Sequence, residues 1–481
     1  MNPPELLTWI DGTPEQSEIA DDTTLNDPNT GEVLQHSRSS SPSQVDRAIA
    51  AADAAHRDGR WRSLTPEARA DVLDRFAHEL QAVAEDIAVA DALNSGVPIG
   101  ITRGFATGIV DVVTDVADRL RRRGDSVRVK AGDRTVVKTR VPWGVAALIL
   151  PWNAPAFMVT KKLAYALAAG ATTVVKPSSF SPWSAQIVVA AAHRAGFPAG
   201  SVNLVTGTGS MGRTLVSDPR VRAISMTGST TTGQAIASSA GANLTRLQLE
   251  LGSNNPALVR EDADLTLTAS QLIRGVTKLS GQWCEAPRRV YVHRNTYEPL
   301  IEALTHELDS LQIGSSLDDT SEVGPLAYRA RVEELDAQLS ALKAQGANIY
   351  RATVNAPERS SFFAPTLAYG EGLELTDEVF GPLLTITPYD DEAAAIELAN
   401  DGSHGLAGYV FTANEPEGLH LAMALEAGEV KVNGTSVLDM ADDSAQGFFA
   451  QSGIGGHGND EVLEFFTGWR IVGTDQDNLP I

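Results

Sequence analysis

The stretch VAALILPWNAPAFMVTKKLAYALAAGATTVVKPSS, residues 145–179, sets the fold that we expect. Its apolar run at 145–150 predicts a buried strand, residues 156–169 predict a helix that ends at Gly170, and residues 172–175 predict a second strand. The same alternation continues with strands at 202–205 and 221–226 and with helices at 182–195, up to 216 and at 230–239. This spacing predicts a parallel sheet with right-handed crossovers.

Polar or glycine-rich turns follow each of these strands. Ser181 is the expected cap of the helix at 182–195, and Gly196 closes it. Ligands of parallel sheets bind beyond the carboxyl ends of the strands. Those ends are PWN at 151–153, KPSS at 176–179, GTG at 207–209 and TGS at 227–229.

The sequence before this alternation predicts a β-rich arm, then helices, then a hairpin. The arm covers the first 35 residues, helices open at Ser41–Gln44 and at Thr65–Pro66, and helical sequence continues to Arg123, where a basic run suits a helix C-terminus. Residues 126–141 predict a hairpin that turns at Gly132–Asp133. An isolated hairpin is marginally stable, so it should pair with another segment or another subunit.

A second α/β block begins after Pro256 and continues to about Phe449. We expect its helices near 264–279, 295–310 and 328–345, and its strands near 289–293, 383–387 and 408–412. The tail at 465–472 ends in a strand-like segment. A chain of 481 residues exceeds one hydrophobic core and predicts two to three domains.

Composition excludes several classes of function. The net charge of −23 argues against binding to nucleic acid or to an anionic membrane, which both require clustered cations. The N-terminus has no signal-peptide or mitochondrial-presequence pattern, and no apolar run has the length of a membrane span. We therefore expect a soluble, cytoplasmic protein. A single cysteine excludes an intrachain disulfide and a cysteine-rich metal site, and we expect no metal.

That cysteine, Cys284, and Glu250 are the candidate catalytic residues. Cys284 is either an inert buried thiol or a nucleophile, and it follows Gly281–Gln282 at an expected helix start, where the helix dipole would lower its pKa. Glu250 lies in an otherwise apolar, strand-like run, LQLEL at 247–251. A carboxylate there is more typical of a general base than of a surface charge.

Two glycine-rich turns are candidates for phosphate binding. Gly207–Gly212 matches GxGxxG after a strand, but the next strand lacks the acidic residue of a dinucleotide fingerprint, so a simple glycine-rich turn is an equal alternative. Gly228–Gly233 opens a helix, and backbone N–H groups there suit a pyrophosphate. Lys176 is either a solvated lysine or a donor to ribose hydroxyls. Asn153 is either a turn former or a donor to an oxyanion.

These residues together resemble the NAD(P)-dependent aldehyde dehydrogenase superfamily, hydrolytic type, over essentially the whole chain. The matching motifs, in family order, are PWNAP, KPSS, MTGST, LELGSNNP, GQWC, EVFGP and SGIG. The resemblance implies an α/β fold with two doubly wound parallel-sheet domains and a β-ribbon oligomerisation element. It divides the chain into a dinucleotide-binding domain (1–124 and 142–252), a catalytic domain (253–450) and an oligomerisation ribbon (125–141 and 465–481). A homodimer or homotetramer is then expected.

The resemblance also implies a mechanism. Cys284 attacks the aldehyde, Asn153 and the Cys284 N–H hold the oxyanion of the thiohemiacetal, and hydride transfer to the nicotinamide leaves a thioester. Glu250 activates the water that hydrolyses it. The implied cofactor-binding residues are Trp152, Lys176, Ser179, Gly209, Gly228, Ser229, Leu251, Glu378 and Phe380.

The sequence departs from the family at positions that bear on specificity. Ser179 stands where NAD-preferring members carry a glutamate for the adenosine 2′-hydroxyl, so NADP+ should be tolerated or preferred. Ser253 replaces a glycine and leaves less room beside the nicotinamide. Gly456–His457 stands where Arg-Glu is common, and His457 is either a proton-relay substitute or a surface loop residue.

The implied substrate tunnel is lined by Ala154, Lys161, Trp283 and Phe449. Ala154 replaces a common phenylalanine and suggests a wider tunnel. Lys161 and the aspartates at 439, 442 and 443 would attract opposite substrate charges. The sequence therefore leaves the identity of the aldehyde open.

Two other functions compete with the hydrolytic one. A CoA-acylating relative does not need the general base, whereas Glu250 is present here. A non-catalytic structural member of the fold would be expected to lose the thiol, whereas Cys284, Glu250 and Asn153 are all retained.

Overall fold

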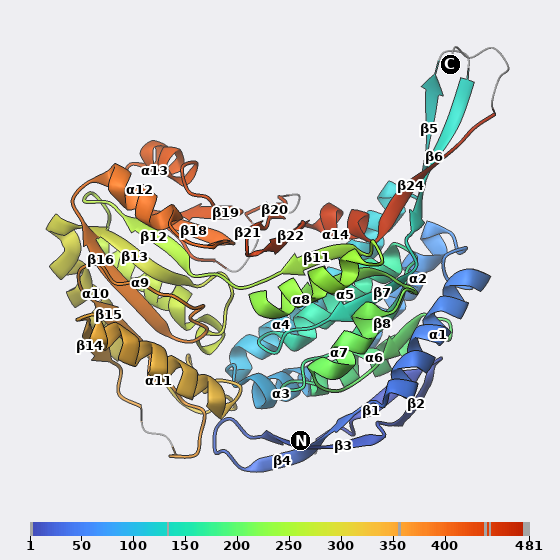
Figure 1. Cartoon of the computed structure of the whole chain (residues 1–481), viewed down its shortest axis with the longest axis horizontal. Helices are drawn as coiled ribbons and strands as arrows, with labels where there is room; N and C mark the ends of the chain where they lie inside the picture. The colour runs from blue at the N-terminus through green and yellow to red at the C-terminus, as the bar shows by residue number, and fades with distance from the viewer. Residues whose placement is uncertain (1–2, 132–133, 355–356, 437–439, 442–443, 475–481) are drawn as a thin grey trace.

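The computed structural model describes residues 3–131, 134–354, 357–436, 440–441 and 444–474. Figure 1 shows two sheets, each covered by helices, and a narrow ribbon that projects from the body on the side of the first sheet. We call the first sheet with its helices the first unit, and the second sheet with its helices the second unit. The turn expected at Gly132–Asp133 and the end of the expected ribbon, 475–481, lie outside the described residues.

The first sheet contains the alternation predicted from residues 145–239. Its parallel strands pair in the order β9 (Val202–Leu204), β8 (Thr172–Lys176), β7 (Val145–Ile149), β10 (Val221–Thr227) and β11 (Arg246–Glu250). Antiparallel strands complete the edges: β1 (Leu7–Ile10) and β2 (Thr13–Gln16) beside β9, and β22 (Gly453–Ile454) beside β11. The expected doubly wound sheet is confirmed.

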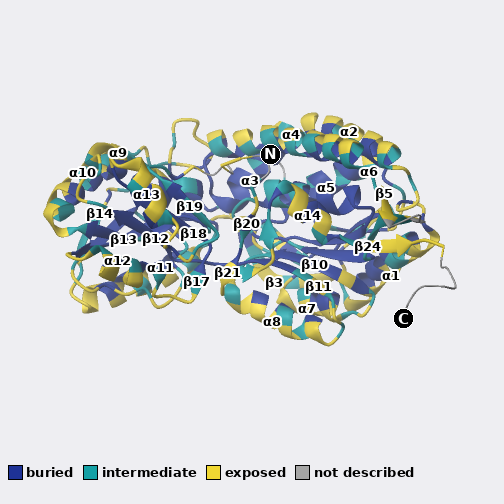
Figure 2. Cartoon of the chain, turned by 90° about the horizontal axis from the view of Figure 1, so that it is seen from above, coloured by how far each residue is buried: buried dark blue, intermediate teal, exposed yellow. Residues whose placement is uncertain are grey.

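Helices cover both faces of this sheet because its strands are apolar on both. In β7, Ala146 and Leu148 pack on one side and Val145 and Ala147 on the other. The first side carries α2 (Pro66–Gln81), α3 (Ala84–Ser95), α4 (Ile99–Arg123), α5 (Pro155–Ala168) and α6 (Trp183–Ala195). The second side carries α1 (Pro42–Asp58), α7 (Gly209–Ser217) and α8 (Thr230–Gly241). Figure 2 shows the buried strands between these helices.

The second sheet repeats this plan with a different strand order. Its strands run β14 (Asn348–Arg351), β15 (Thr366–Tyr369), β16 (Leu383–Tyr389), β13 (Pro287–His293), β12 (Asn255–Val259), β18 (Ala407–Phe411) and β19 (Glu429–Val432). All are parallel except β14. Its covering helices are α9 (Leu265–Thr277), α10 (Tyr297–Ser310), α11 (Arg329–Ala344), α12 (Glu392–Asn400) and α13 (Glu415–Ala422). The sequence did not predict β12, β14, β15, β19, α12 or α13.

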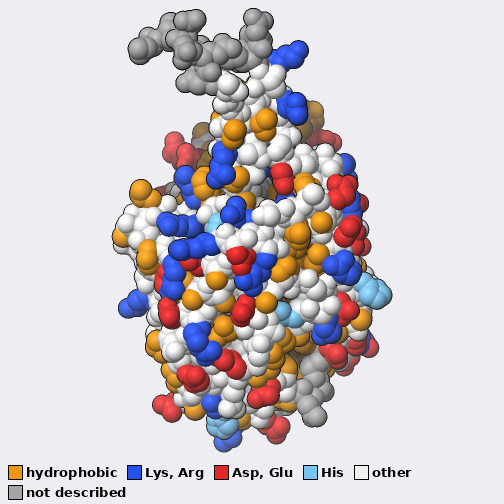
Figure 3. Space-filling model, turned by 90° about the vertical axis from the view of Figure 1, so that its right-hand side faces the viewer, with side chains coloured by type: hydrophobic (Ala, Val, Ile, Leu, Met, Phe, Trp, Pro, Cys, Tyr) orange, Lys and Arg blue, Asp and Glu red, His pale blue; other side chains and the backbone are white. Residues whose placement is uncertain are grey.

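The ribbon is a three-stranded antiparallel sheet. The expected hairpin is β5 (Ser126–Ala131) with β6 (Arg134–Pro142), and β6 also pairs with β24 (Thr467–Val472). The hairpin partner that the sequence required is therefore the C-terminal strand of the same chain. Trp469 of β24 is covered by cations, since Lys138 Nζ and Arg140 Cζ lie 3.9 and 4.0 Å from its ring centroid. Figure 3 shows hydrophobic and basic side chains together on this face.

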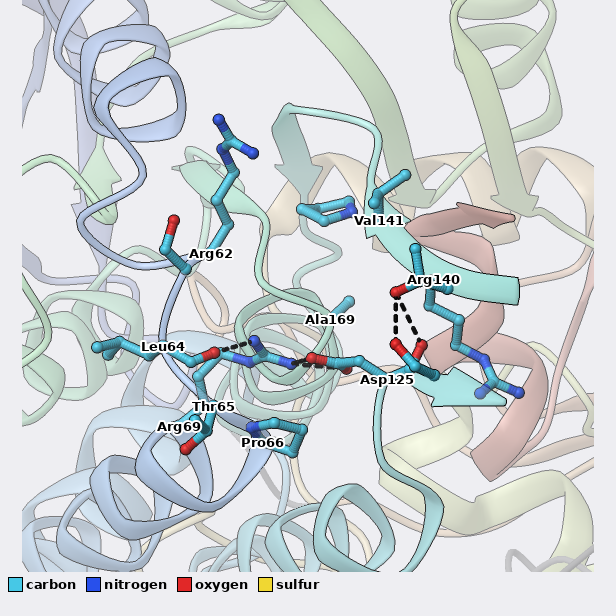
Figure 4. A pocket seen from close by; sticks show the side chains of 13 residues that line it. Arg62, Leu64, Thr65, Pro66, Arg69, Asp125, Arg140, Val141 and Ala169 are labelled. Atoms are coloured by element: carbon cyan, nitrogen blue, oxygen red, sulfur yellow. Dashed lines mark hydrogen bonds and ion pairs between the residues drawn. The ribbon is translucent and has the colours of Figure 1, made fainter. Parts of the chain in front are cut away.

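A buried arginine fastens the base of the ribbon to the body. Arg69 of α2 is 2% exposed and donates to both Asp125 carboxylate oxygens at 2.8 Å and to Ala168 O at 3.1 Å. Figure 4 shows this pair at the edge of a cavity of about 480 Å³, which Arg140 also lines. The cavity lies at the ribbon base, away from the residues predicted to be catalytic.

Most expected helix ends are confirmed. Ser41 and Gln44 form a capping box, and Thr65 caps α2 through the Ala68 N–H. The Ser181 prediction is wrong: the N-cap of α6 is Pro182, no side chain caps the helix, and the Ser181 hydroxyl is buried without a hydrogen-bond partner among the described residues. The closing glycine, Gly196, has a left-handed φ of 89° as expected.

The longest helix, α4, is amphipathic. Ile109, Val113 and Val116 lie on its buried face, and its last turn carries Arg121–Arg123 before Gly124, as the basic run predicted. Within the described ranges, no helix is both long and apolar enough to cross a membrane.

Candidate active site

The two candidate catalytic side chains, Cys284 and Glu250, meet between the two units. Glu250 is the last residue of β11, and Cys284 lies in the loop between a 3₁₀ turn (Lys278–Gly281) and β13. The Cys284 Sγ donates to Glu250 Oε1 at 3.1 Å. Thr227 of the neighbouring β10 donates to the other oxygen, Oε2, at 2.9 Å. A strand end of the first sheet therefore presents its carboxylate to the thiol of the second unit.

The main chain beside Glu250 is held by the SGIG motif. Ser452 O accepts the Leu251 N–H at 2.9 Å, and the Ser452 hydroxyl donates to Gly252 O at 2.9 Å. Gly453, the first residue of β22, pairs with Glu250 of β11. The motif thus fixes the residues on both sides of the carboxylate.

The loop that carries Cys284 is fixed by polar side chains. Gly281 has a φ of 81°, and a Cβ there would lie 2.2 Å from Pro382 N, so only glycine fits. The buried Gln282 side chain donates to Ser95 O at 2.9 Å and accepts the Ala327 N–H at 2.8 Å. Asn255 donates to Cys284 O at 2.9 Å.

A buried arginine that sequence reasoning missed, Arg288, forms hydrogen bonds to the backbone of the same loop. Its Nη2 donates to Gly281 O at 2.6 Å and to Trp283 O at 3.3 Å, and its Nη1 donates to Gly381 O. The only sequence signal was the pair Arg288–Arg289 in an apolar strand. These bonds take up carbonyls that a helix would otherwise use.

The expected helix start at Cys284 is therefore wrong, and so is the expected fall in thiol pKa. Residues 282–286 form no helix, so the thiol does not lie in the first turn of a helix of its own segment. Burial raises the pKa of Cys284 well above its ordinary value, and the nearby carboxylates of Glu250 and Glu285 raise it further. The resting group is a neutral thiol that donates to Glu250.

Asn153 lies next to this loop. It precedes α5, and its Nδ2 donates to Gln282 O at 2.7 Å, two residues before Cys284 in the chain. Its neighbour Trp152 contacts Phe380 edge to face, with ring centroids 5.1 Å apart. PWNAP and GQWC, separate in sequence, thus form one site.

The residues predicted to bind a cofactor on the first unit lie at neighbouring strand ends. Lys176 ends β8, α7 begins at Gly209 after β9, and Gly228 and Ser229 follow β10. The Ser229 hydroxyl caps α8 by accepting the Thr232 N–H at 3.3 Å, and Leu251 packs against the same helix at Gly233. Burial lowers the pKa of Lys176 to about 8, and its Nζ donates to Pro177 O at 3.2 Å. Ser179, three residues later, is partly exposed.

Glu378 and Phe380 approach from the second unit. Glu378 Oε1 accepts the Ser253 N–H at 3.2 Å, and the carboxylate lies so close to Gly252 that a Cβ there would be 2.3 Å from Oε2. Burial raises the pKa of Glu378 to about 7, while the Ser253 N–H and the charge of Arg288 oppose that rise. The residues predicted to bind the cofactor thus come from both units.

An apolar cluster surrounds the nucleophile. Its buried members are Val97, Leu279, Trp283 and Ala286, and the partly buried side chains against them are Ile101, Phe105, Ala154 and Cys284. Phe105 contacts Phe157 at a centroid distance of 5.6 Å, and Lys161 Nζ lies 5.9 Å from the Phe157 centroid. Ala154 and Trp283 thus belong to the cluster that contains Cys284, and Lys161 lies near Phe157; that these residues line a substrate tunnel stays a prediction. Sequence reasoning missed Ile101, Phe105 and Phe157, which are ordinary helical hydrophobics in sequence.

The remaining predicted residues lie elsewhere. Phe449 is in β21 (Phe449–Ala450), which pairs with β17 (His404–Gly405), and its side chain is 50% exposed; its part in a substrate tunnel stays a prediction. His457 is in β23 (Gly456–His457), where its ring contacts Phe448 at 5.5 Å. The aspartates at 439, 442 and 443 lie outside the described residues.

A doubly wound sheet with glycine-rich turns at its strand ends, beside a buried thiol and carboxylate, is the arrangement of a dinucleotide-dependent oxidoreductase. Residues 15–472 match the model of the aldehyde dehydrogenase family. The chain belongs to this family, and it is an oxidoreductase that acts on aldehydes with NAD(P)+.

Individual relatives agree with this assignment. An aspartate-semialdehyde dehydrogenase (non-phosphorylating) of Halomonas elongata is 33% identical over 465 residues, covering 95% of this chain and 94% of the relative. A probable succinate-semialdehyde dehydrogenase [NADP(+)] of Sinorhizobium fredii is 31% identical and covers 98% and 96%. The crystal structure of an NAD-dependent aldehyde dehydrogenase from Sinorhizobium meliloti aligns with a TM-score of 0.93 at 26% identity, covering 100% and 96%.

The raised thiol pKa makes alkylation of Cys284 a direct test of the site. Only the thiolate reacts, so the rate with iodoacetamide should rise about tenfold per pH unit and still be rising at pH 9. Glu250→Gln removes a carboxylate that raises this pKa, so it should shift the profile to lower pH. Labelling is read by mass spectrometry, with Cys284→Ala as the unreactive control because the chain has no other cysteine. A rate that levels off near neutral pH would contradict a neutral resting thiol.

Proposed function

We propose that Cys284, Glu250 and Asn153 carry out a hydrolytic aldehyde oxidation. The observation that carries this proposal is the 3.1 Å contact between Cys284 Sγ and Glu250 Oε1. It gives the neutral thiol a base, so the sulfur can attack the aldehyde carbon as its proton moves to the carboxylate. The second amide hydrogen of Asn153 and the Cys284 N–H serve as donors to the resulting oxyanion.

Glu250 then has a second task. Bound NAD(P)+ supplies the hydride acceptor that takes the thiohemiacetal to a thioester. Once the thioester has formed, Glu250 releases the proton that it took from the thiol to solvent. Its Oε1, which no longer has a thiol partner, can then accept a proton from water and pass it to the departing sulfur. Thr227 holds Oε2 and keeps the carboxylate at the loop. The attack of that water releases the carboxylic acid and regenerates the thiol.

Pre-steady-state kinetics separate these two tasks. Glu250→Gln should still give a burst of reduced cofactor, but a slower one, because the thiol must then lose its proton to solvent instead of to Glu250. Steady-state turnover should fall about a hundredfold or more, since general-base catalysis of hydrolysis is lost. The burst is followed by absorbance in a stopped-flow instrument. Cys284→Ser, the matched control, should give no burst.

An unchanged steady state in Glu250→Gln would remove Glu250 from the hydrolytic step. Restoration of turnover by added CoA, with a CoA thioester as product, would favour the CoA-acylating alternative. Normal folding of wild type without any reduced cofactor from an aldehyde panel would favour a non-catalytic member of the fold.

For the cofactor, we propose that NADP+ is accepted at least as well as NAD+. Ser179 follows Lys176 at the end of β8, and it offers a hydroxyl in place of a carboxylate. A 2′-phosphate there meets the Lys176 ammonium without a repelling charge. The name of the S. fredii relative includes NADP, which agrees with this proposal.

Ser179→Glu tests the cofactor proposal. The added carboxylate should lower kcat/KM for NADP+ about tenfold or more through like-charge repulsion and leave kcat/KM for NAD+ equal or higher. Ser179→Gln, similar in size but neutral, is the control and should affect both cofactors alike. Equal losses with Glu and Gln would mean that size, and not charge, decides.

For the substrate, we propose an aldehyde with a carboxylate at its far end. Lys161 lies one helical turn beyond Phe157, and Phe157 contacts Phe105 of the apolar cluster that contains Cys284. Its ammonium would meet the far end of a substrate bound along these side chains. The H. elongata and S. fredii relatives are both named as semialdehyde dehydrogenases.

Lys161→Ala should raise KM for succinate semialdehyde about tenfold or more, since a charge-assisted contact is lost, and leave KM for butanal unchanged. Lys161→Arg keeps the charge and should retain most of the selectivity. Equal effects on the charged and the neutral aldehyde would place the substrate carboxylate elsewhere.

We also propose the division of labour and the assembly that the sequence suggested. Residues 1–124 and 142–252 bind the dinucleotide, residues 253–450 carry the nucleophile, and residues 125–141 with the C-terminal segment from 465 join subunits. What supports the last part is the ribbon, which exposes Val127, Val129, Ile471 and Val472 away from the body of its own chain. A homodimer or homotetramer would cover these side chains.

A further inference from the structure

An aromatic bridge joins the two units beside the cofactor residues. Phe180 follows Ser179 directly, and its ring stacks on that of Tyr328, which precedes α11 in the second unit. The ring centroids are 4.0 Å apart and the planes differ by 14°. The Phe180 side chain remains 43% exposed beside this stack.

The Tyr328 side of the bridge is firmly placed. Tyr328 contacts Trp152 edge to face at 5.4 Å, and Trp152 in turn contacts Phe380. The Arg331 Nη2 donates to the Tyr328 hydroxyl at 3.3 Å, and the Arg331 guanidinium carbon lies 5.9 Å from the centroids of both Tyr328 and Phe380. Phe180, in contrast, stands on a short loop held by the bond from its N–H to Ser178 Oγ at 3.2 Å.

The bridge lies across the route that an extended dinucleotide would take. Lys176 and Ser179, the proposed contacts of the adenosine ribose, are on the Phe180 side. Glu378 and Phe380, the proposed contacts of the nicotinamide ribose, are on the Tyr328 side. A dinucleotide that reaches both sets passes beside the stacked rings, and Trp152 contacts both Tyr328 and Phe380 on the side of the second set.

We propose that Phe180 and Tyr328 form a clasp that opens to admit the dinucleotide and closes again over it. They are positioning residues that act on cofactor entry and release, and this role rests on the proposal that NAD(P)+ binds between the two units. One aromatic contact shifts the equilibrium between the open and the closed clasp about two- to tenfold toward the closed form. The closed form is thus favoured, but only by a small free-energy difference that thermal motion overcomes often. The clasp therefore slows association and dissociation together.

The test is a stopped-flow measurement of NADPH binding and release, followed by the fluorescence of the reduced nicotinamide. Phe180→Ala removes the exposed half of the clasp and should raise both the association and the dissociation rate constants about two- to tenfold. Kd should change less than either rate. Phe180→Tyr and Tyr328→Phe keep both rings stacked and should retain the wild-type rates.

A double variant distinguishes a clasp from two independent contacts. If the stack acts as one unit, Phe180→Ala with Tyr328→Ala should be no faster than the faster single variant. The aldehyde KM, measured at saturating cofactor, should stay unchanged in Phe180→Ala because the apolar cluster around Cys284 is untouched.

Several outcomes would overturn the clasp. A faster dissociation with an unchanged association rate would mean that Phe180 contacts the cofactor directly, and unchanged rates would mean that the ring has no role in binding. Wild-type protein that binds neither NADPH nor NADH would instead refute the proposed cofactor site, a result distinct from either of these.

Discussion

The contact between the Cys284 thiol and the Glu250 carboxylate joins the ends of two separate sheets, and much of the structure serves to hold it. Thr227 fixes the carboxylate from the neighbouring strand. Arg288 of the second unit donates to Gly281 O in the loop that carries the thiol. Gln282, within that loop, donates to Ser95 O in α3. A hydrogen bond of this length tolerates shifts of only a few tenths of an ångström, so the two units must be held together as firmly as one core.

The sequence was most informative where local chemistry decides the structure. Apolar strands such as 145–150, closing glycines and the Ser41 capping box follow from the residues themselves. The two candidate catalytic side chains, which do meet in the structure, could be named because each chemical group is rare in its surroundings. The failures arose where tertiary contacts decide. The sequence before Cys284 resembles a helix start, but the backbone carbonyls there accept hydrogen bonds from side chains. Asn255 donates to Cys284 O, and Arg288 donates to Gly281 O. Strand β12 was missed because NPALV begins with a proline motif rather than an apolar run.

Specificity was harder to predict than chemistry. Ile101 and Phe105 belong to the helix of the first unit that borders the nucleophile, yet nothing in a helical repeat marks the turn that faces a site. Phe449 lies on a short strand with a half-exposed side chain, so the structure leaves its part in a substrate tunnel a prediction. The effect of the aspartates at 439, 442 and 443 on substrate charge stays a prediction from sequence, because these residues lie outside the described residues.

The ribbon and the first sheet both close with strands from the end of the chain. β24 pairs with β6, more than three hundred residues earlier, and β22 covers the edge of β11. On a ribosome that adds about 5–20 residues per second, the first unit can collapse well before these strands emerge. Until then β11 presents an unpaired edge next to Glu250, which is the kind of edge that invites contact with other chains. The emergence of β22 and β24 therefore determines when the nascent enzyme stops being vulnerable to aggregation through these two edges.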